Sequence, residues 1–243
     1  MSEKVQKVLA NAGLGSRRQI EDWIRSGRIR INGEIANIGD RMTTDMAVSI
    51  DGRPVKLVKS LTKKTRVLLY NKPEGEICTR ADPEKRPTVF SHLPLLRNSR
   101  WITVGRLDIN TQGLLLFTNN GELANKLMHP RTALEREYAV RVHGIVTPQI
   151  LSNLKQGVKL EDGMGHFEKI SEVGGEGSNR WFNVIVKQGR NRLVRRLWES
   201  QNVQISRLMR VRYGNITLPR NLHRGQWQEM EPLEVDQLLA SLE

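Results

Sequence analysis

The sequence has a single cysteine, Cys78, among 243 residues. One cysteine cannot form an intramolecular disulfide, and it excludes a zinc site built from several cysteines. The histidines are scattered and lack the spacing of metal ligands: His92, His129, His143, His166 and His223. We therefore expect neither a disulfide framework nor a metal site made from these residue types.

Long apolar runs are also missing. No stretch approaches the roughly 18 apolar residues of a membrane-spanning helix, and residues 1–7 lack the apolar segment of a secretory signal. A basic protein of the membrane surface is a weaker alternative, because no segment combines a lysine-rich face with a bulky apolar one. We expect a cytoplasmic protein that does not contact a membrane.

Acidic residues are the minority charge. Lys and Arg total 39 against 26 acidic residues, which gives a formal net charge of +13 and an isoelectric point near 10.3. This balance favours partners rich in phosphate. Apolar residues make up 38% of the chain and charged residues 27%, a composition that supports a sizeable core and argues against general disorder.

Residues 1–58 are expected to form a small module of two helices followed by two hairpins. Apolar residues recur at helical spacing before Gly13, and Ser16 is a good cap for a second helix that ends near Gly27. The expected hairpins and their turns are 28–37 around Asn32-Gly33 and 47–55 around Asp51-Gly52.

Cations gather in this first module: Lys4, Lys7, Arg17, Arg18, Arg25, Arg28 and Arg30. Arg17 and Arg18 fall in the first turn of the second helix, where the helix dipole favours anions. An ordinary solvated basic face is the simpler interpretation, but the clustering favours nucleic acid. Residues 6–18 and 27–33 resemble the S4 RNA-binding domain, so Arg17, Arg18 and Arg28 are expected to bind RNA.

Residues 59–65 are polar and basic, and they predict a linker. Beyond it, over 66–243, strands outnumber helices and few β-helix-β units repeat, so we expect an α+β fold with a mainly antiparallel, mixed sheet. The expected strands are 66–70, 113–118, 136–143, 166–172 and 181–187. Helices are expected over 122–128, over 148–155 and from about Asn191, and residues 174–178 are expected to form a hairpin loop.

Asp108 ends the segment Gly105-Arg106-Leu107-Asp108, just before the apolar run 114–117. The run predicts a buried strand, so Asp108 is expected on a loop that a rigid scaffold holds, where catalytic groups are often found. One fixed carboxylate among many cations suggests a nucleophile or base aimed at a polyanion. Taken alone, a turn aspartate that bonds its own backbone is the more frequent case.

Two further segments could carry chemistry. The strand over 136–143 places Tyr138 and Val140 on one face and its charges mostly on the other, although a lone tyrosine is more often a core aromatic. The segment 188–197 joins a glycine turn to a very basic helix, which could simply bind phosphate at its N-terminus. Its arginines are Arg190, Arg192, Arg195 and Arg196.

Together these segments resemble the RsuA/RluB-type family of ribosomal RNA pseudouridine synthases, over nearly the whole chain. Residues 70–75 look like the family's Lys-Pro-x-Gly turn, and the Gly-Arg-Leu-Asp segment is its most specific motif. Residues 121–130 and 207–214 look most similar to the branch of the family that acts on 23S ribosomal RNA.

The resemblance implies that the protein isomerises a uridine of 23S ribosomal RNA after turning the base out of its stack. Asp108 falls on the catalytic aspartate, Tyr138 on the active-site tyrosine, and Arg190 on the arginine beside the aspartate. Arg190 is expected to keep Asp108 ionised, and Arg106 to fill the space that the base leaves. The arginines at 192, 195 and 196 are expected to bind RNA. No cofactor or metal is implied, and a monomer is expected.

Two other functions stay open from the residues themselves. A non-enzymatic RNA-binding or ribosome-associated protein would explain the charge and the first module, but not the set of Asp108, Tyr138 and Arg190. An RNA hydrolase or nuclease would need metal-binding carboxylates or a histidine pair, and neither occurs at useful spacing. An isomerase is therefore the favoured prediction.

Overall fold

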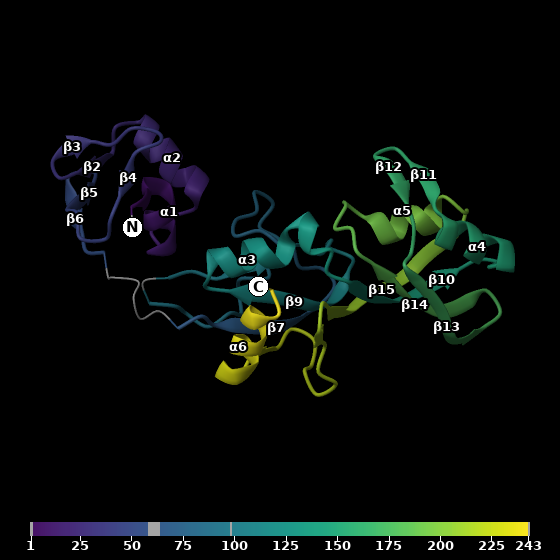
Figure 1. The fold of residues 1–243 in the computed structure, drawn as a ribbon. Helices are drawn as coiled ribbons and strands as arrows, with labels where there is room; N and C mark the ends of the chain where they lie inside the picture. The colour runs from purple at the N-terminus through teal and green to yellow at the C-terminus, as the bar shows by residue number, and fades with distance from the viewer. Residues whose placement is uncertain (1, 58–63, 98, 243) are drawn as a thin grey trace. The chain divides into compact units, whose positions relative to one another are not determined.

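The computed structural model describes residues 2–57, 64–97 and 99–242, and within it the chain divides into two compact units (Figure 1). The first unit comprises the described residues of Met1–Arg66, Pro94–Ile102 and Asn119–Gly121. The second unit comprises those of Val67–Leu93, Thr103–Thr118 and Glu122–Glu243. The predicted linker lies outside the described residues except for Lys64 and Thr65, so the domain boundaries at 58 and 66 stay predictions.

The first unit begins with a short strand and two helices, β1 (Glu3–Lys4), α1 (Val5–Asn11) and α2 (Arg17–Arg25). The predicted cap of α2 is present. The Ser16 hydroxyl accepts the Gln19 backbone N–H at 3.0 Å, and the Gln19 side chain accepts the Ser16 backbone N–H at 3.4 Å. This capping box satisfies two backbone donors that would otherwise lack partners at the helix start.

The two predicted hairpins of the first unit are confirmed. They form one antiparallel sheet in the order β3-β2-β5-β6, whose strands are β2 (Ile29–Ile31), β3 (Glu34–Ile35), β5 (Val48–Ile50) and β6 (Arg53–Val55). Asn32 and Asp51 have φ of 50° and 52°, and each precedes a glycine of positive φ, as two-residue hairpin turns require. A further short strand, β4 (Arg41–Met42), pairs with β1.

The second unit is built on one mixed sheet in the order β13-β14-β10-β15-β9-β7-β17, with β16 beside β15 and β8 beside β9. The strands are β7 (Val67–Lys72), β8 (Ile102–Val104), β9 (Gln112–Thr118), β10 (Arg136–His143), β13 (Lys169–Glu176), β14 (Asn179–Val186), β15 (Gln204–Tyr213), β16 (Ile216–Thr217) and β17 (Trp227–Glu229). The pair β15–β9 is parallel, whereas β7–β9, β10–β15 and β10–β14 are antiparallel. The predicted α+β fold is confirmed.

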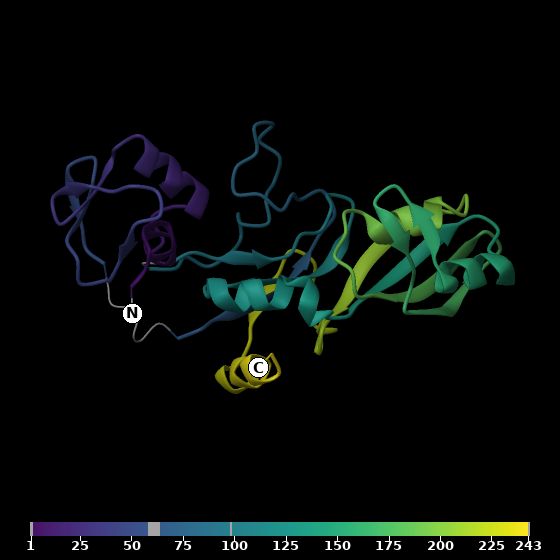
Figure 2. The same ribbon diagram turned by 45° about the horizontal axis from the view of Figure 1, so that its top comes forward.

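Helices cover this sheet. The helix α3 (Gly121–Met128) lies alongside β9 in both Figure 1 and Figure 2. The helices α4 (Pro148–Gln156) and α5 (Leu193–Glu199) pack their apolar side chains on the part of the sheet formed by β10, β13 and β14, around buried Phe182 and Trp198. The remaining elements are the turn η2 (Pro130–Thr132), the hairpin β11 (Val158–Leu160) with β12 (Gly163–Gly165), and α6 (Pro232–Ala240). None of the helices in the described ranges is long and apolar enough to cross a bilayer.

Three predictions for the second unit were wrong in detail. Residues 174–176 belong to β13, and the turn is confined to Gly177-Ser178. A Cβ on Gly175 would lie 2.3 Å from the Asn179 carbonyl oxygen, so this glycine permits a close strand contact rather than a loop. Residues 166–168 precede β13 instead of forming its start. The helix α5 begins at Leu193, because Arg192 adopts a left-handed φ of 48°.

Candidate active site

Asp108 lies on the loop between β8 and β9, as predicted. The main chain turns there, with the Thr111 N–H donating to the Asp108 carbonyl oxygen at 3.0 Å. The strand that follows is fully buried from Leu114 to Phe117. The Asp108 side chain is half-buried, and among the described residues its carboxylate has no hydrogen-bond or ion-pair partner. The loop therefore presents a carboxylate that its own backbone does not use.

Lys72 binds the part of this loop that follows Asp108. It is the last residue of β7 and is fully buried. Its Nζ donates to the carbonyl oxygens of Pro73 at 2.9 Å, Ile109 at 3.3 Å and Thr111 at 2.9 Å, which uses the three donors of an ammonium group. The Gly75 N–H also donates to the Ile109 oxygen, at 2.9 Å. Burial lowers the pKa of Lys72, and the neighbouring acidic groups, Asp108 among them, oppose that shift.

Cys78 contacts the part of the loop that precedes Asp108. Its Sγ donates to the Leu107 carbonyl oxygen at 3.3 Å and accepts the Leu107 N–H at 3.4 Å. Burial raises the pKa of the Cys78 thiol, against the Leu107 contact and the charges of Lys72, Arg210 and Arg106. The thiol is therefore neutral near pH 7, and its contacts fix the backbone just before Asp108.

Arg195 reaches the same loop from α5. Its Nη2 donates to the Asn110 carbonyl oxygen at 2.8 Å. Burial lowers the pKa of Arg195 and so does Arg192, whereas the negative charge of Asp108 opposes the shift. The guanidinium of Arg195 thus lies close enough to Asp108 for their charges to interact, although the two groups form no ion pair within 4 Å among the described residues.

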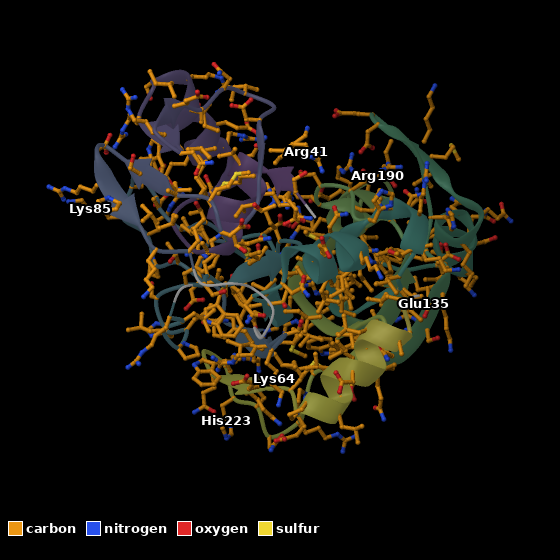
Figure 3. All side chains as sticks on the ribbon, turned by 60° about the vertical axis from the view of Figure 1, so that its left-hand side comes forward. Arg41, Lys64, Lys85, Glu135, Arg190 and His223 are labelled. Carbon is orange, nitrogen blue, oxygen red and sulfur yellow. The ribbon has the colours of Figure 1, made fainter. Side chains whose placement is uncertain are left out.

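Arg190 does not pair with Asp108, and this expectation was wrong. Its guanidinium binds Asp162 instead, through Nε at 3.1 Å and Nη2 at 2.5 Å, and it also donates to the Met164 carbonyl oxygen at 2.7 Å. Arg196 binds the same carboxylate at 2.8 and 2.9 Å. Arg196 foremost, together with Arg190, lowers the pKa of Asp162 to about 2. Arg190, labelled in Figure 3, therefore holds the β11–β12 hairpin rather than the Asp108 loop.

Tyr138 lies on β10, half-buried, and packs against the apolar cluster under α4 and α5. The predicted face is only partly correct, because Arg136 shares the Tyr138 side of the strand and is buried. The Arg136 guanidinium donates to the Lys187 carbonyl oxygen at 2.5 Å and to the Tyr213 hydroxyl at 3.2 Å. Directly opposite Tyr138, on β15, stands Arg210.

The remaining predicted RNA-binding arginines of the second unit differ in whether their side chains have acidic partners. Arg106 is exposed, and no hydrogen bond or ion pair engages its side chain in the described part of the chain. Arg192 forms an ion pair with Glu199 at 3.2 Å. Arg196 is committed to Asp162. Arg192 and Arg196, like Arg190, thus have acidic partners in the free protein.

In the first unit, Arg17 and Arg18 are the first residues of α2 and are exposed, and neither has a side-chain partner among the residues described. Arg28 differs. It forms a two-pronged pair with Asp51, at 2.7 and 2.5 Å, and its guanidinium lies 5.3 Å from the Trp23 ring centroid. The pair with Arg28 lowers the pKa of Asp51.

The sequence analysis did not identify the buried side chains around the Asp108 loop: Lys72, Cys78 and Arg210. The contact of Arg195 with the Asp108 loop was not predicted either, and RNA binding by Arg195 stays a prediction. Helical spacing offers one signal for Arg195, because it falls on the first turn of α5 next to the buried Val194, whereas Arg190 precedes the helix. No group of three or more His, Cys, Asp or Glu side chains within the described ranges is arranged to hold a metal ion.

Two family models match the chain. The model described as RNA pseudouridylate synthase matches residues 66–200, and the S4 domain model matches residues 3–48. The second match covers both helices and the first hairpin of the first unit, and α2 carries Arg17 and Arg18. The first match includes the Asp108 loop, Tyr138 and the arginines up to Arg196.

Among known proteins, the chain is 56% identical over 245 residues to the ribosomal large subunit pseudouridine synthase B of Salmonella typhimurium, covering all of this chain and 84% of that protein. It is 58% identical over 238 residues to the protein of the same name from Pasteurella multocida, covering 97% and 69%. A solved structure titled "Crystal structure of pseudouridylate synthase" matches with a TM-score of 0.66 at 22% identity, over 97% of this chain and 99% of that one. That last similarity bears on the fold alone.

Proposed function

The chain belongs to the RNA pseudouridylate synthase family, and on that premise we propose that it converts a specific uridine of large-subunit (23S) ribosomal RNA to pseudouridine, with Asp108 as the nucleophile. The names of the relatives support the choice of RNA, because both are large-subunit enzymes. The net charge of +13 suits such a polyanion.

One observation carries the role of Asp108. Its loop is fixed on both sides, by Cys78 at Leu107 and by Lys72 at Ile109 and Thr111, while its carboxylate keeps no partner in the described part of the chain. A turn aspartate of purely structural value would use its carboxylate on nearby backbone donors. A rigid loop with an uncommitted carboxylate is instead what nucleophilic catalysis needs.

The reaction rearranges one nucleotide without net gain or loss of atoms. The C1′–N1 bond breaks and its electron pair passes to the uracil, the ring turns, and C5 bonds to C1′. The proton on C5 leaves and N1 gains a proton, so the mass is unchanged. Asp108 attacks as a carboxylate, and the bond that it forms with the nucleotide breaks again before the product leaves. Arg195 is the cation beside its loop, with Nη2 on the Asn110 carbonyl oxygen, and its charge interacts with that of Asp108. We therefore assign to Arg195 the role expected for Arg190.

Tyr138 offers a ring on which the base can stack and a hydroxyl that can move a proton of the sugar. The target uridine must leave its stack, at a cost of a few kcal/mol. Arg106 is exposed two residues before Asp108 and can occupy the vacated space with its planar guanidinium. The first unit adds RNA affinity through Arg17 and Arg18. We propose that the enzyme acts as a monomer in the cytoplasm.

The test compares the wild-type protein with Asp108→Asn on a 23S ribosomal RNA transcript. The substitution keeps the size of the side chain and removes the nucleophile. We expect the wild type to produce one carbodiimide-reactive uridine and the variant to produce none, while RNA binding stays within a few-fold. Shortened RNA would indicate a nuclease, and substantial pseudouridine from the purified Asn variant would remove Asp108 from the mechanism.

The cellular counterpart is a map of pseudouridines in ribosomal RNA from a strain that lacks this protein. We expect one site in the large-subunit RNA to lose its modification and to regain it with a wild-type copy, but not with an Asp108→Asn copy. A map identical to that of the parent strain would contradict the proposed substrate.

A further inference from the structure

Arg210 is a buried cation without an acidic partner. Its side chain is 2% exposed, its Nε donates to the Leu114 carbonyl oxygen at 2.7 Å, and its Nη2 is buried with no hydrogen-bond partner. No carboxylate pairs with it among the described residues. The Tyr213 ring, whose centroid lies 5.0 Å from the guanidinium carbon, provides partial compensation.

Burial of an uncompensated charge is costly, on the order of several kcal/mol for one ion. Replacement of such a charge by an apolar side chain of similar volume is often neutral or stabilising. A contribution to folding stability therefore does not explain a buried arginine at this position. Its neighbours suggest what the charge acts on.

Strand pairing places Arg210 in a row of side chains across the sheet. Arg210 stands opposite Tyr138 of β10 on one side and opposite Gly113 of β9 on the other. Gly113 in turn stands opposite Lys72 of β7. The row Tyr138, Arg210, Gly113 and Lys72 thus joins the proposed active-site tyrosine to two buried cations, with neighbouring strands about 5 Å apart.

Gly113, two residues after the Asp108 loop residue Thr111, is the point in this row where β9 and β15 approach each other closely. It has φ of 99°, and a Cβ there would lie 2.3 Å from the Arg210 carbonyl oxygen. Glycine at this position therefore lets β9 and β15 approach closely, and Lys72, opposite Gly113 on β7, binds the loop at Ile109 and Thr111. The Oγ of Thr111, in a residue that is 1% exposed, also lacks a hydrogen-bond partner.

The charge of Arg210 reaches the part of the loop that precedes Asp108 as well. It opposes the rise in the pKa of the Cys78 thiol, as Lys72 and Arg106 do, and Cys78 contacts the residue just before Asp108. In a low-dielectric interior such a field is weakly screened. The charge of Arg210 therefore reaches Cys78, which contacts the residue just before Asp108, and Arg210 stands opposite Tyr138 in the sheet.

We propose that Arg210 is a positioning residue for the reaction, a fixed positive charge bound to the strand that follows the Asp108 loop, which stabilises the negative charge of the carboxylate and of the uracil once the C1′–N1 bond has broken. The inference rests on the proposed function. Arg210 is not expected to contact the RNA backbone, since its side chain is almost fully buried. Its effect should therefore fall on the chemical step and not on RNA affinity.

The test uses the full-length chain with Arg210→Met, which keeps most of the side-chain volume without the charge, and Arg210→Lys, which restores the charge. We expect Arg210→Met to lower the single-turnover rate at saturating enzyme roughly 10- to 100-fold, somewhat less than the loss of a donor that contacts the reacting atoms. RNA affinity should change less than about twofold and the melting temperature should stay equal or rise. Arg210→Lys should recover most of the rate.

Arg207→Met is the matched control, because it removes an exposed arginine from the same strand. Its single-turnover rate at saturation should equal that of the wild type. Arg210→Met at the wild-type rate would overturn the inference. Equal slowing in the Met and Lys variants with a lowered melting temperature would do the same, since that pattern indicates a structural role only.

Failure of the proposed function would look different. In that case the wild-type protein would bind the RNA and form no pseudouridine, before any variant is compared. Pseudouridine formation by the wild type together with an unaffected Arg210→Met variant would leave the proposed function in place and contradict only the inference on Arg210.

Discussion

In the first unit, Arg17 and Arg18 stand exposed at the start of α2, whereas in the second unit Lys72 and Arg210 are buried beside the loop that carries Asp108. Exposed cations interact with phosphate through a high dielectric and are screened by salt. Buried cations act over short distances in a low dielectric, and their field is present before the substrate arrives.

A count of basic residues therefore combines side chains with two different proposed functions. Within the net charge of +13, we expect the exposed side chains to set RNA affinity and the buried ones to set the rate of the chemical step. Acidic partners mark a third group. Three arginines form ion pairs in the free protein: Arg28 with Asp51, and Arg190 and Arg196 with Asp162. Their charges are therefore largely neutralised by these carboxylates.

The largest expected difference separates Arg195 from Arg190. Arg195→Met should lower the saturated single-turnover rate about 10²- to 10³-fold, the usual cost of losing one fixed electrostatic stabiliser, because its charge acts on Asp108. Arg190→Met should lower it less than about tenfold, through a looser β11–β12 hairpin. Rapid-quench measurement of pseudouridine formation checks both, and the reverse order would restore the original assignment of Arg190.

Tyr138 should follow with a graded effect. If its hydroxyl moves a proton, Tyr138→Phe will bind RNA normally and turn over roughly 10²-fold more slowly, the lower range for general acid–base catalysis, and Tyr138→Ala will also lose stacking. Single-turnover rates of the two variants decide the matter. An active Phe variant beside an inactive Ala variant would limit Tyr138 to stacking, and wild-type rates in both would remove it from the site.

The exposed cations of the first unit should affect binding alone. Each phosphate contact adds roughly 0.7 to 0.9 to the slope of log affinity against log salt, so alanine at both Arg17 and Arg18 should flatten it by about 1.4 to 1.8. Alanine at Arg28 should add little, because Asp51 already holds that side chain. A salt series of RNA-binding measurements tests this, and an unchanged slope for the double variant would reduce the cluster to a solvated face.

The smallest effect concerns Asp162. Because its pKa in the folded protein lies near 2 and its unfolded value is higher, the contribution of its ion pairs is present above about pH 4 and is lost as the pH falls toward 2. Asp162→Asn should therefore be slightly less stable than the wild type at pH 7, and the difference should shrink below pH 4. Urea unfolding at both pH values measures it, and a difference independent of pH would argue against these pairs.

Regular patterns made much of the fold predictable. Ser16 with Gln19, the two Asx-Gly turns and the apolar run 114–117 each state a local preference that the tertiary structure keeps. The strand β15 was not predicted, because the buried Arg210 breaks the apolar alternation on which such a prediction depends. The helix α6 was also missed, although proline at Pro232 and the capping box of Glu231 and Glu234 were readable signals.

The site was predictable only where one residue type fits one role. The loop position of Asp108 and the strand position of Tyr138 were predicted correctly, whereas their roles come from the family resemblance and stay predictions. The choice of Arg195 over Arg190 depends on where α5 begins, and the left-handed Arg192 that sets this start has no signature in the sequence. Likewise, the neighbourhood of Lys72, Gly113 and Arg210 depends on the parallel pairing of β15 with β9, which joins segments almost a hundred residues apart.

One measurement tests the contrast between the two units most directly: the dissociation constant for RNA and the saturated single-turnover rate, determined together for the Arg17→Ala, Arg18→Ala double variant and for Arg195→Met. We expect the double variant to bind more weakly and to react at the wild-type rate once saturated, and we expect Arg195→Met to bind within a few-fold and to react at least about 10²-fold more slowly. A double variant that stays slow at saturation, or an Arg195→Met variant that keeps the wild-type rate, would contradict this contrast.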